Sequence, residues 1–170
     1  VGMPVPVEPM RRYHHHVLGV QPFDRMPFIK DSSGLAIQTL SPGLLVGLVD
    51  FSAAGGFDTP VDAHYFESAV WAPLARRIPS LERCKVTYTG TGFYDQNRLD
   101  GNAILGNWPG HLDQYYVACG FSGHGLMHAL GMGRGLAELV VHGKYQTIDL
   151  SRFGYERVVE GAGVAEQGVR

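Results

Sequence analysis

One run constrains this chain more than any other part of it: YYVACGFSGHGL, residues 115–126. Its first part is apolar, as expected for a buried strand, and closely spaced glycines then lead into a helical pattern. A strand that turns tightly into a helix aims the unpaired N–H groups of the first helical turn at a ligand. Because the peptide dipoles place roughly +0.5 charge there, we expect an anion or an electron-rich carbonyl above residues 123–125. A glycine-rich turn that binds nothing is the alternative.

The segment that follows, residues 124–141, is predicted to be a helix with a face of small residues. It contains Gly131, Gly133 and Gly135, and each interior glycine costs about 0.5 to 1 kcal/mol relative to alanine. Such a cost is sustained where another backbone or a flat ligand comes close. Since Arg134 and Glu138 lie in the same segment, we interpret it as a helix that lies against a sheet and not as a membrane span.

The sequence contains no dinucleotide-binding fingerprint. The pattern GMGRG at residues 131–135 lacks the last glycine spacing of GxGxxG and lies inside the expected helix, and no GxxxxGK[ST] occurs. We therefore expect that the phosphates of any cofactor above residues 123–125 are held by residues outside this chain.

Alternating apolar residues and turn signals predict a strand-rich remainder. One helix is expected over residues 61–77, because Phe66, Val70, Leu74 and Ile78 are spaced by four, and Pro73 should kink or end its regular part. The tail 162–170 is expected to fray. The expected strands cover residues 5–17, 26–30, 35–39, 44–49, 83–95 and 102–105.

Charge and metal-ligand patterns argue against two classes of function. A formal charge of −2 with scattered basic residues gives no footprint for nucleic acid. His124 and His128 are one helical turn apart, but they lack the glutamate of HExxH, so no metal site is expected. The histidines at residues 14–16 alternate across their strand, so at most His14 and His16 share a face, and a solvent-side position is expected for the run in place of a ligand role. His64 and His142 are expected at the surface.

Several motifs resemble the FAD-dependent D-amino-acid-oxidase superfamily, which includes monomeric sarcosine oxidase. Within it, the chain is most similar to mitochondrial FAD-dependent oxidoreductases linked to the assembly of respiratory complex I. The matching motifs are GFSGHG at residues 120–125, GRGLAEL at 133–139, TIDLSRF at 147–153, PVEPMRRY near the start and GFYDQN at 92–97.

The resemblance implies an α+β fold: a mixed, largely antiparallel substrate-domain sheet with helices, then the last strand and helix of a Rossmann-type FAD domain. It places residues 1–112 in the substrate domain and residues 113–161 in the FAD domain, with 162–170 as a flexible tail. It also implies non-covalent FAD, bound only when an N-terminal half with the GxGxxG motif is present, in the same polypeptide or in a second chain.

The resemblance assigns a set of site residues. Tyr94 is the catalytic candidate, because its phenol could donate a hydrogen bond to substrate or flavin. The flavin-bound cysteine of sarcosine oxidase corresponds to Gly92, which excludes covalent attachment there. Where the amine-oxidising relative has a lysine, this chain has the neutral Met127. The cofactor-binding candidates are Gly92, Ser122, Gly123, His124, Gly125, Leu126 and Met127.

Two functions remain open at this stage. The favoured one is the C-terminal half of an oxidoreductase for small amines or amino acids. The other is a catalytically silent flavoprotein remnant that serves as a structural or assembly subunit of a mitochondrial complex. The resemblance implies the mitochondrial matrix, and neither nucleic acid nor a membrane span is expected as part of the function.

Overall fold

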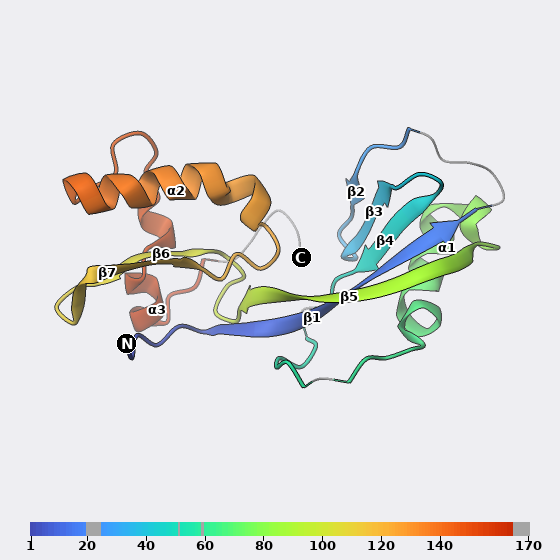
Figure 1. Ribbon diagram of the computed structural model, residues 1–170, viewed down its shortest axis with the longest axis horizontal. Coiled ribbons are helices and arrows are strands. Elements are labelled where there is room, and N and C mark those ends of the chain that lie inside the picture. The colour runs from blue at the N-terminus through green and yellow to red at the C-terminus, as the bar shows by residue number, and fades with distance from the viewer. Residues whose placement is uncertain (20–24, 51, 59, 165–170) are drawn as a thin grey trace. The chain divides into compact units, whose positions relative to one another are not determined.

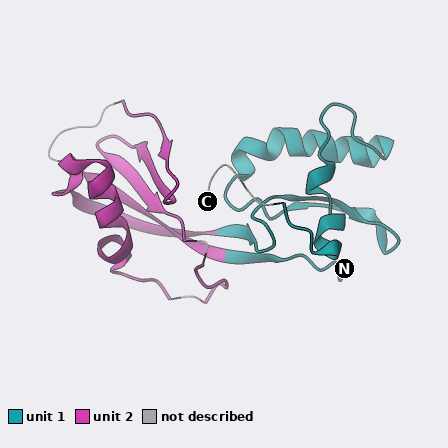
Figure 2. Ribbon diagram, turned by 180° about the vertical axis from the view of Figure 1, so that it is seen from behind, with its two compact units in different colours: residues 1–9, 94–166 teal, residues 10–93, 167–170 magenta. Residues whose placement is uncertain are grey.

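The computed structural model describes residues 1–19, 25–50, 52–58 and 60–164 (Figure 1). Contacts divide the chain into two compact units, shown in Figure 2. Among the described residues, unit 1 comprises Val1–Pro9 and residues 94–164, and unit 2 comprises residues 10–93. The division falls inside two long strands, β1 (Val7–Leu18) and β5 (Lys85–Asn97).

Unit 2 is built on a sheet with the strand order β2-β3-β4-β1-β5. Antiparallel pairing joins β2 (Ile29–Lys30) to β3 (Leu35–Thr39), β3 to β4 (Leu44–Leu48), and β4 to β1. The expected strands at residues 35–39 and 44–49 are confirmed, because the turns that bound them are strongly marked by Ser, Gly and Pro. Residues 20–24, 51, 59 and 165–170, including most of the expected tail, lie outside the described residues.

The helical segment of unit 2 is shorter than the sequence predicts. A π-helical turn, η1 (Phe66–Val70), leads into α1 (Trp71–Arg77), and the short η2 (Pro79–Leu81) follows. The prediction that the helix begins at residue 61 is wrong, because Asp62 instead accepts a hydrogen bond from the His64 N–H in a turn (2.8 Å). Pro73 does not end the helix; the wide η1 turn precedes it, which avoids the clash of its ring with the carbonyl one turn earlier.

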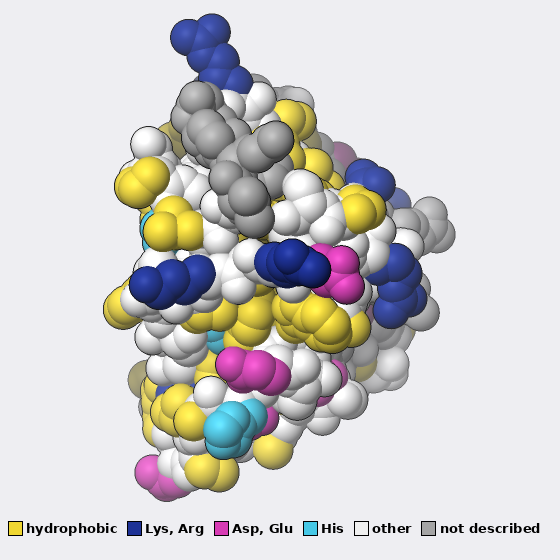
Figure 3. Space-filling view, turned by 90° about the vertical axis from the view of Figure 1, so that its right-hand side faces the viewer, with side chains coloured by type: hydrophobic (Ala, Val, Ile, Leu, Met, Phe, Trp, Pro, Cys, Tyr) yellow, Lys and Arg dark blue, Asp and Glu magenta, His cyan; other side chains and the backbone are white. Residues whose placement is uncertain are grey.

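The core of unit 2 forms where η1 and α1 cover one face of the sheet. The fourfold spacing seen in the sequence is borne out in part, since Phe66, Val70 and Leu74 are buried. The buried members of this core are Val17, Leu35, Ile37, Leu44, Val46, Phe66, Val70, Leu74 and Leu81. Figure 3 views one face of the chain, on which apolar, basic and acidic side chains are interspersed.

Unit 1 packs one long helix against a two-stranded antiparallel sheet. The strands are β6 (Ile104–Trp108) and β7 (Leu112–Cys119), and the helix is α2 (Gly125–His142). Two short helices, η3 (Ser151–Phe153) and α3 (Glu156–Glu160), follow. The α+β class with antiparallel sheets is confirmed, and α2 lies against β6 and β7 as expected.

One expectation for this unit is wrong, and another holds only in part. β7 is not a buried strand: it is half-buried or exposed along its length, because the described residues supply no further strand beside it. The small-residue face of α2 is packed only in part. Gly135 lies against Leu150 and Tyr145, whereas side chains added at Gly131 and Gly133 would meet nothing within 4 Å.

Candidate functional site

The turn between β7 and α2 has an unusual backbone. Gly120, Ser122 and Gly123 all have positive φ, at 69°, 51° and 92°. A non-glycine residue in this conformation is uncommon and needs support from its surroundings. Ser122 has that support, since it is 5% exposed and its Oγ accepts a hydrogen bond from the Asn97 N–H (3.0 Å) and donates to the Gly120 carbonyl (3.3 Å).

The end of β5 holds this turn in place. The Asp95 carboxylate accepts a hydrogen bond from the Phe121 N–H (2.9 Å), and the Asp95 carbonyl accepts one from the Ser122 N–H (3.2 Å). Together with Asn97, Asp95 therefore fixes where α2 begins. In the sequence, Asp95 and Asn97 stood out only as parts of a motif shared with the family, and their role in positioning the turn was missed. The signal for it was a short polar run at the end of a long alternating strand.

The first turn of α2 is open toward its N-terminus. His124 is the N-cap residue and makes no side-chain capping bond, so no cap from its own side chain satisfies the amides of Gly125, Leu126 and Met127. Leu126 is 93% exposed and Met127 66% exposed. The predicted donor set is thus brought together at one helix end, where the helix dipole favours negative charge.

Tyr94 belongs to the same cluster. Its ring occupies the space that a side chain at Gly123 would fill, with Cδ2 2.7 Å and Cζ 2.8 Å from the ideal Cβ position. Glycine is therefore needed at position 123 for two reasons: its φ of 92° disfavours any other residue, and a side chain there would clash with the Tyr94 ring. Tyr94 is itself 39% exposed, so the residue reaches solvent next to the start of α2.

Gly92 belongs to unit 2, and the contacts of its neighbours show which face of β5 it occupies. Thr91 and Phe93 both contact Arg11, through a hydrogen bond of 3.1 Å and a cation–π contact of 4.6 Å. Because strand residues alternate between faces, Gly92 points to the other face, with Gly90. A side chain at Gly92 would meet nothing within 4 Å, so this position is open.

Not all of the histidines at residues 14–16 lie on the solvent side of β1. His15 is 1% exposed, its Nδ1 lies 2.9 Å from Thr89 Oγ1, and its ring meets that of Phe66 edge-on. Burial, reinforced by the nearby His14, lowers the pKa of His15. His64 and His142 are exposed, as expected.

His124 and His128 have parallel rings 5.8 Å apart, but no group of three or more His, Cys, Asp or Glu side chains in the described ranges is arranged to hold a metal ion. Within the same ranges, no helix is both long and apolar enough to span a membrane.

This geometry agrees with what comparisons with known proteins show. The family model described as FAD dependent oxidoreductase matches residues 1–139. The chain belongs to this family. The match includes the whole turn and most of α2, so the amide-rich helix start lies within the family's own fold.

Curated relatives carry the name FAD-dependent oxidoreductase domain-containing protein 1. The protein from Mus musculus is 34% identical over 99% of this chain, and that from Bos taurus is 37% identical over 94%. The chain spans about a third of their length, 35% and 34%. It therefore corresponds to a part of these relatives.

Solved structures support the same assignment. L-proline dehydrogenase from P. horikoshii aligns with a TM-score of 0.74 and 26% identity, covering 96% of this chain and 43% of that one. Glycine oxidase from Geobacillus kaustophilus aligns with a TM-score of 0.70 and 24% identity, covering 90% of this chain and 40% of that one, which shows a shared fold.

Proposed function

We propose that this chain is the C-terminal part of an FAD-dependent oxidoreductase that oxidises small amines or amino acids. FAD is bound non-covalently, and only together with an N-terminal part that supplies the dinucleotide fingerprint. In this proposal residues 1–112 contribute to the substrate side and residues 113–161 to the FAD side. The observation that carries it is the turn clamped by Asp95, which presents the open amides of α2 beside Tyr94.

The residues present fit a flavin. A helix N-terminus with unpaired amides suits the electron-rich carbonyl edge of a flat ring, and the absence of a side chain at Gly123 leaves room for the Tyr94 ring beside this helix end. Bound FAD would supply the electron-accepting chemistry. The chain's own contributions are to orient that edge, to stabilise negative charge near it through the α2 amides, and to offer the Tyr94 phenol as a hydrogen-bond donor to substrate.

A silent remnant in a mitochondrial assembly is the second candidate function, and two features favour it. Met127 is neutral and cannot pair with a substrate carboxylate. The Tyr94 ring also packs on Gly123, so the turn can be closed by the chain itself. In either case we place the protein in the mitochondrial matrix, following the resemblance described above.

Flavin content separates these two candidates. Under the first, the full-length protein that carries this sequence should be yellow as purified, with absorbance near about 450 nm, and should bleach when an amine or amino-acid substrate is added without air. A colourless full-length protein that takes up no added FAD would contradict the enzyme and support the remnant.

A charge at the helix start tests the site itself. Met127→Glu places a carboxylate in the first turn of α2, which suits the helix dipole but opposes negative charge on a neighbouring ligand. We expect it to lower the reduction potential of bound FAD by about 6–20 mV, from roughly 0.3–1 kcal/mol of charge interaction. The isosteric Met127→Gln is the matched control. Equal potentials for the two variants would place the flavin elsewhere.

A further inference from the structure

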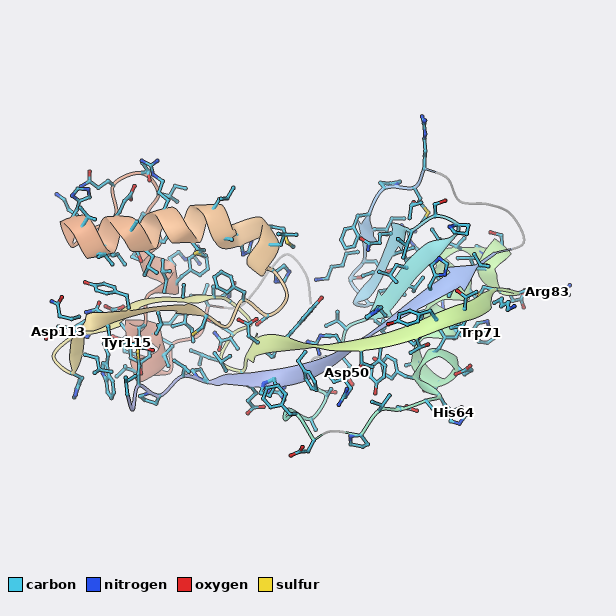
Figure 4. All side chains as sticks on the ribbon, in the orientation of Figure 1. Asp50, His64, Trp71, Arg83, Asp113 and Tyr115 are labelled. Atoms are coloured by element: carbon cyan, nitrogen blue, oxygen red, sulfur yellow. The ribbon has the colours of Figure 1, made fainter. Side chains whose placement is uncertain are left out.

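Unit 2 contains a cavity that shares no residue with the proposed flavin site. It has a volume of about 210 Å³, which is smaller than the roughly 300–1,000 Å³ of pockets that take drug-sized ligands. Arg11 and Tyr13 line it from β1 and Asp50 from the segment after β4, with Tyr65 and small apolar residues completing the wall. Figure 4 shows Asp50 below β1 and β5, on the side where His64 also lies.

The cavity and Gly92 lie on opposite faces of the sheet. Arg11 donates to Thr91 and stacks on Phe93, whereas Gly92 alternates to the other side of β5. On that other side, the ring of His14 occupies the space beside Gly90. The cavity is therefore not part of the surface that Gly92 offers to a cofactor.

A cationic group and an anionic group both line this cavity. The Arg11 guanidinium is held by Thr91 Oγ1 (3.1 Å) and by the Phe93 ring (4.6 Å). The Asp50 carboxylate is held by Ser52, whose Oγ and N–H donate to Oδ1 at 2.6 and 2.8 Å. These bonds from Ser52 lower the pKa of Asp50, so its carboxylate is ionised at neutral pH.

Two stacked aromatic rings also line the cavity. The rings of Tyr13 and Tyr65 stack with centroids 4.3 Å apart. The Tyr13 hydroxyl accepts a hydrogen bond from the Asp62 N–H (2.8 Å), and no acceptor for its own proton occurs among the residues that the structure describes. That hydroxyl is thus a donor available to a ligand.

We propose that this cavity binds a small zwitterionic amino acid, at a site that shares no residue with the proposed flavin site. Arg11 and the Tyr13 hydroxyl bind the carboxylate, Asp50 binds the ammonium group, and the Tyr13–Tyr65 wall packs against a short side chain. The site stands on the geometry of unit 2 alone, so it holds whether or not the chain serves an oxidase.

The first test measures ligand binding to the full chain by NMR, through the chemical shifts of its labelled backbone amides. Glycine and L-proline are the probes. We expect saturable shifts centred on Ala53 and Ala54, with a dissociation constant of about 1 mM, as suits a ligand of few atoms. No saturable shift at these amides would overturn the proposal.

The second test removes one charge from the protein and the matching charge from the ligand. Asp50→Asn should weaken glycine binding about tenfold and leave N-acetylglycine, which lacks the ammonium group, unchanged. Arg11→Gln should have the reverse pattern, weakening glycine about tenfold and leaving glycinamide unchanged. Asp58→Asn and Arg76→Gln, both at exposed positions, are the matched controls.

The proposal can still be tested if a variant does not fold, because the wild-type chain can be compared with different ligands. Should Arg11→Gln fail to fold, the wild-type chain must still bind glycine more tightly than either N-acetylglycine or glycinamide. Equal affinity for all three ligands, or for Asp50→Asn and Asp58→Asn, would overturn the proposal. Unchanged glycine shifts at Ala53 in Tyr94→Phe would support it, because that variant alters the flavin site only.

Discussion

The two units of this chain are stabilised in different ways. Unit 2 has an apolar core shared by its sheet, η1 and α1. Unit 1 has a much smaller apolar core, formed by Ala103, Leu105, Met132 and Leu150, and it leaves apolar side chains of α2 exposed, with Leu126 at 93% and Leu130 at 90%. The unit that presents the proposed flavin site is thus the one with less hydrophobic stabilisation.

In unit 1, buried polar contacts compensate for the smaller apolar core. Arg157 and Asp100 form an ion pair at 2.9 Å with side chains 7% and 1% exposed. The Arg157 guanidinium also donates to the carbonyls of Phe153 (2.6 Å) and Ala103 (2.8 Å). Such pairs demand a single geometry, because a displaced charge stays buried without a partner. The comparison indicates that unit 1 depends more on exact polar contacts near the turn before α2, and we expect it to tolerate substitution less well.

The comparison can be tested unit by unit, because each unit contains one of the two tryptophans, Trp71 in unit 2 and Trp108 in unit 1. The largest effect is expected for Asp100→Asn. Burial raises the pKa of Asp100, but the bonds from Arg157, Val164 and Asn102 outweigh it and lower the pKa overall. Losing this charge should cost about 3–5 kcal/mol, measured by urea unfolding followed through Trp108 fluorescence in a Trp71→Phe background.

An exposed ion pair in the same unit is the control. Arg98 and Glu8 lie 3.0 Å apart with side chains 30% and 50% exposed, so Arg98→Gln should cost no more than about 1 kcal/mol. Asp100→Asn could shift the urea midpoint reported by Trp71 as far as the one reported by Trp108. The two units would then unfold together, and the claim that they are stabilised in different ways would be wrong.

The apolar core of unit 2 gives the second prediction. Leu74 is fully buried, and Leu74→Ala should destabilise the Trp71 transition by about 2–5 kcal/mol through lost burial and the cavity left behind. Leu126→Ala, at a 93% exposed position, should change stability by less than about 0.5 kcal/mol. A cost below about 1 kcal/mol for Leu74→Ala would mean that this core is loosely packed.

The sequence predicted elements well where local chemistry decides them. β3 and β4 lie between strong turn signals, and the glycines after β7 correctly placed the start of α2. Burial was predicted less well. β7 looked buried and is not. The histidine run was expected on the solvent side, but His15 lies in the core, because the run carries no apolar pattern. The helix start at residues 123–125 was predicted from its glycine pattern and the other site residues from resemblance. The hydrogen bonds from the turn to Asp95 join distant segments, which no periodicity reveals.

A third, intermediate effect is expected at the turn. Gly123→Ala should cost about 1–3 kcal/mol, since an l-residue at a φ of 92° is strained and its Cβ meets the Tyr94 ring. The double variant with Tyr94→Ala should recover part of that loss, because it removes the ring but not the strain. A double-mutant cycle on the Trp108 transition measures the share due to the ring. Strictly additive costs would show that ring and turn do not interact.

The smallest effect should appear only as pH is varied, at the contact between α2 and the segment after it. Hydrogen bonds from the Thr147 hydroxyl (2.6 Å) and the Gln146 N–H (2.8 Å) lower the pKa of Glu138 from 4.5 to about 2. Because the folded pKa is the lower one, this contribution is complete above about pH 4.5 and is lost as pH falls toward 2. The stability advantage of the wild-type chain over Glu138→Gln, followed through Trp108, should therefore shrink between pH 5 and pH 2.5, and a constant difference would contradict an ionised Glu138 in the fold.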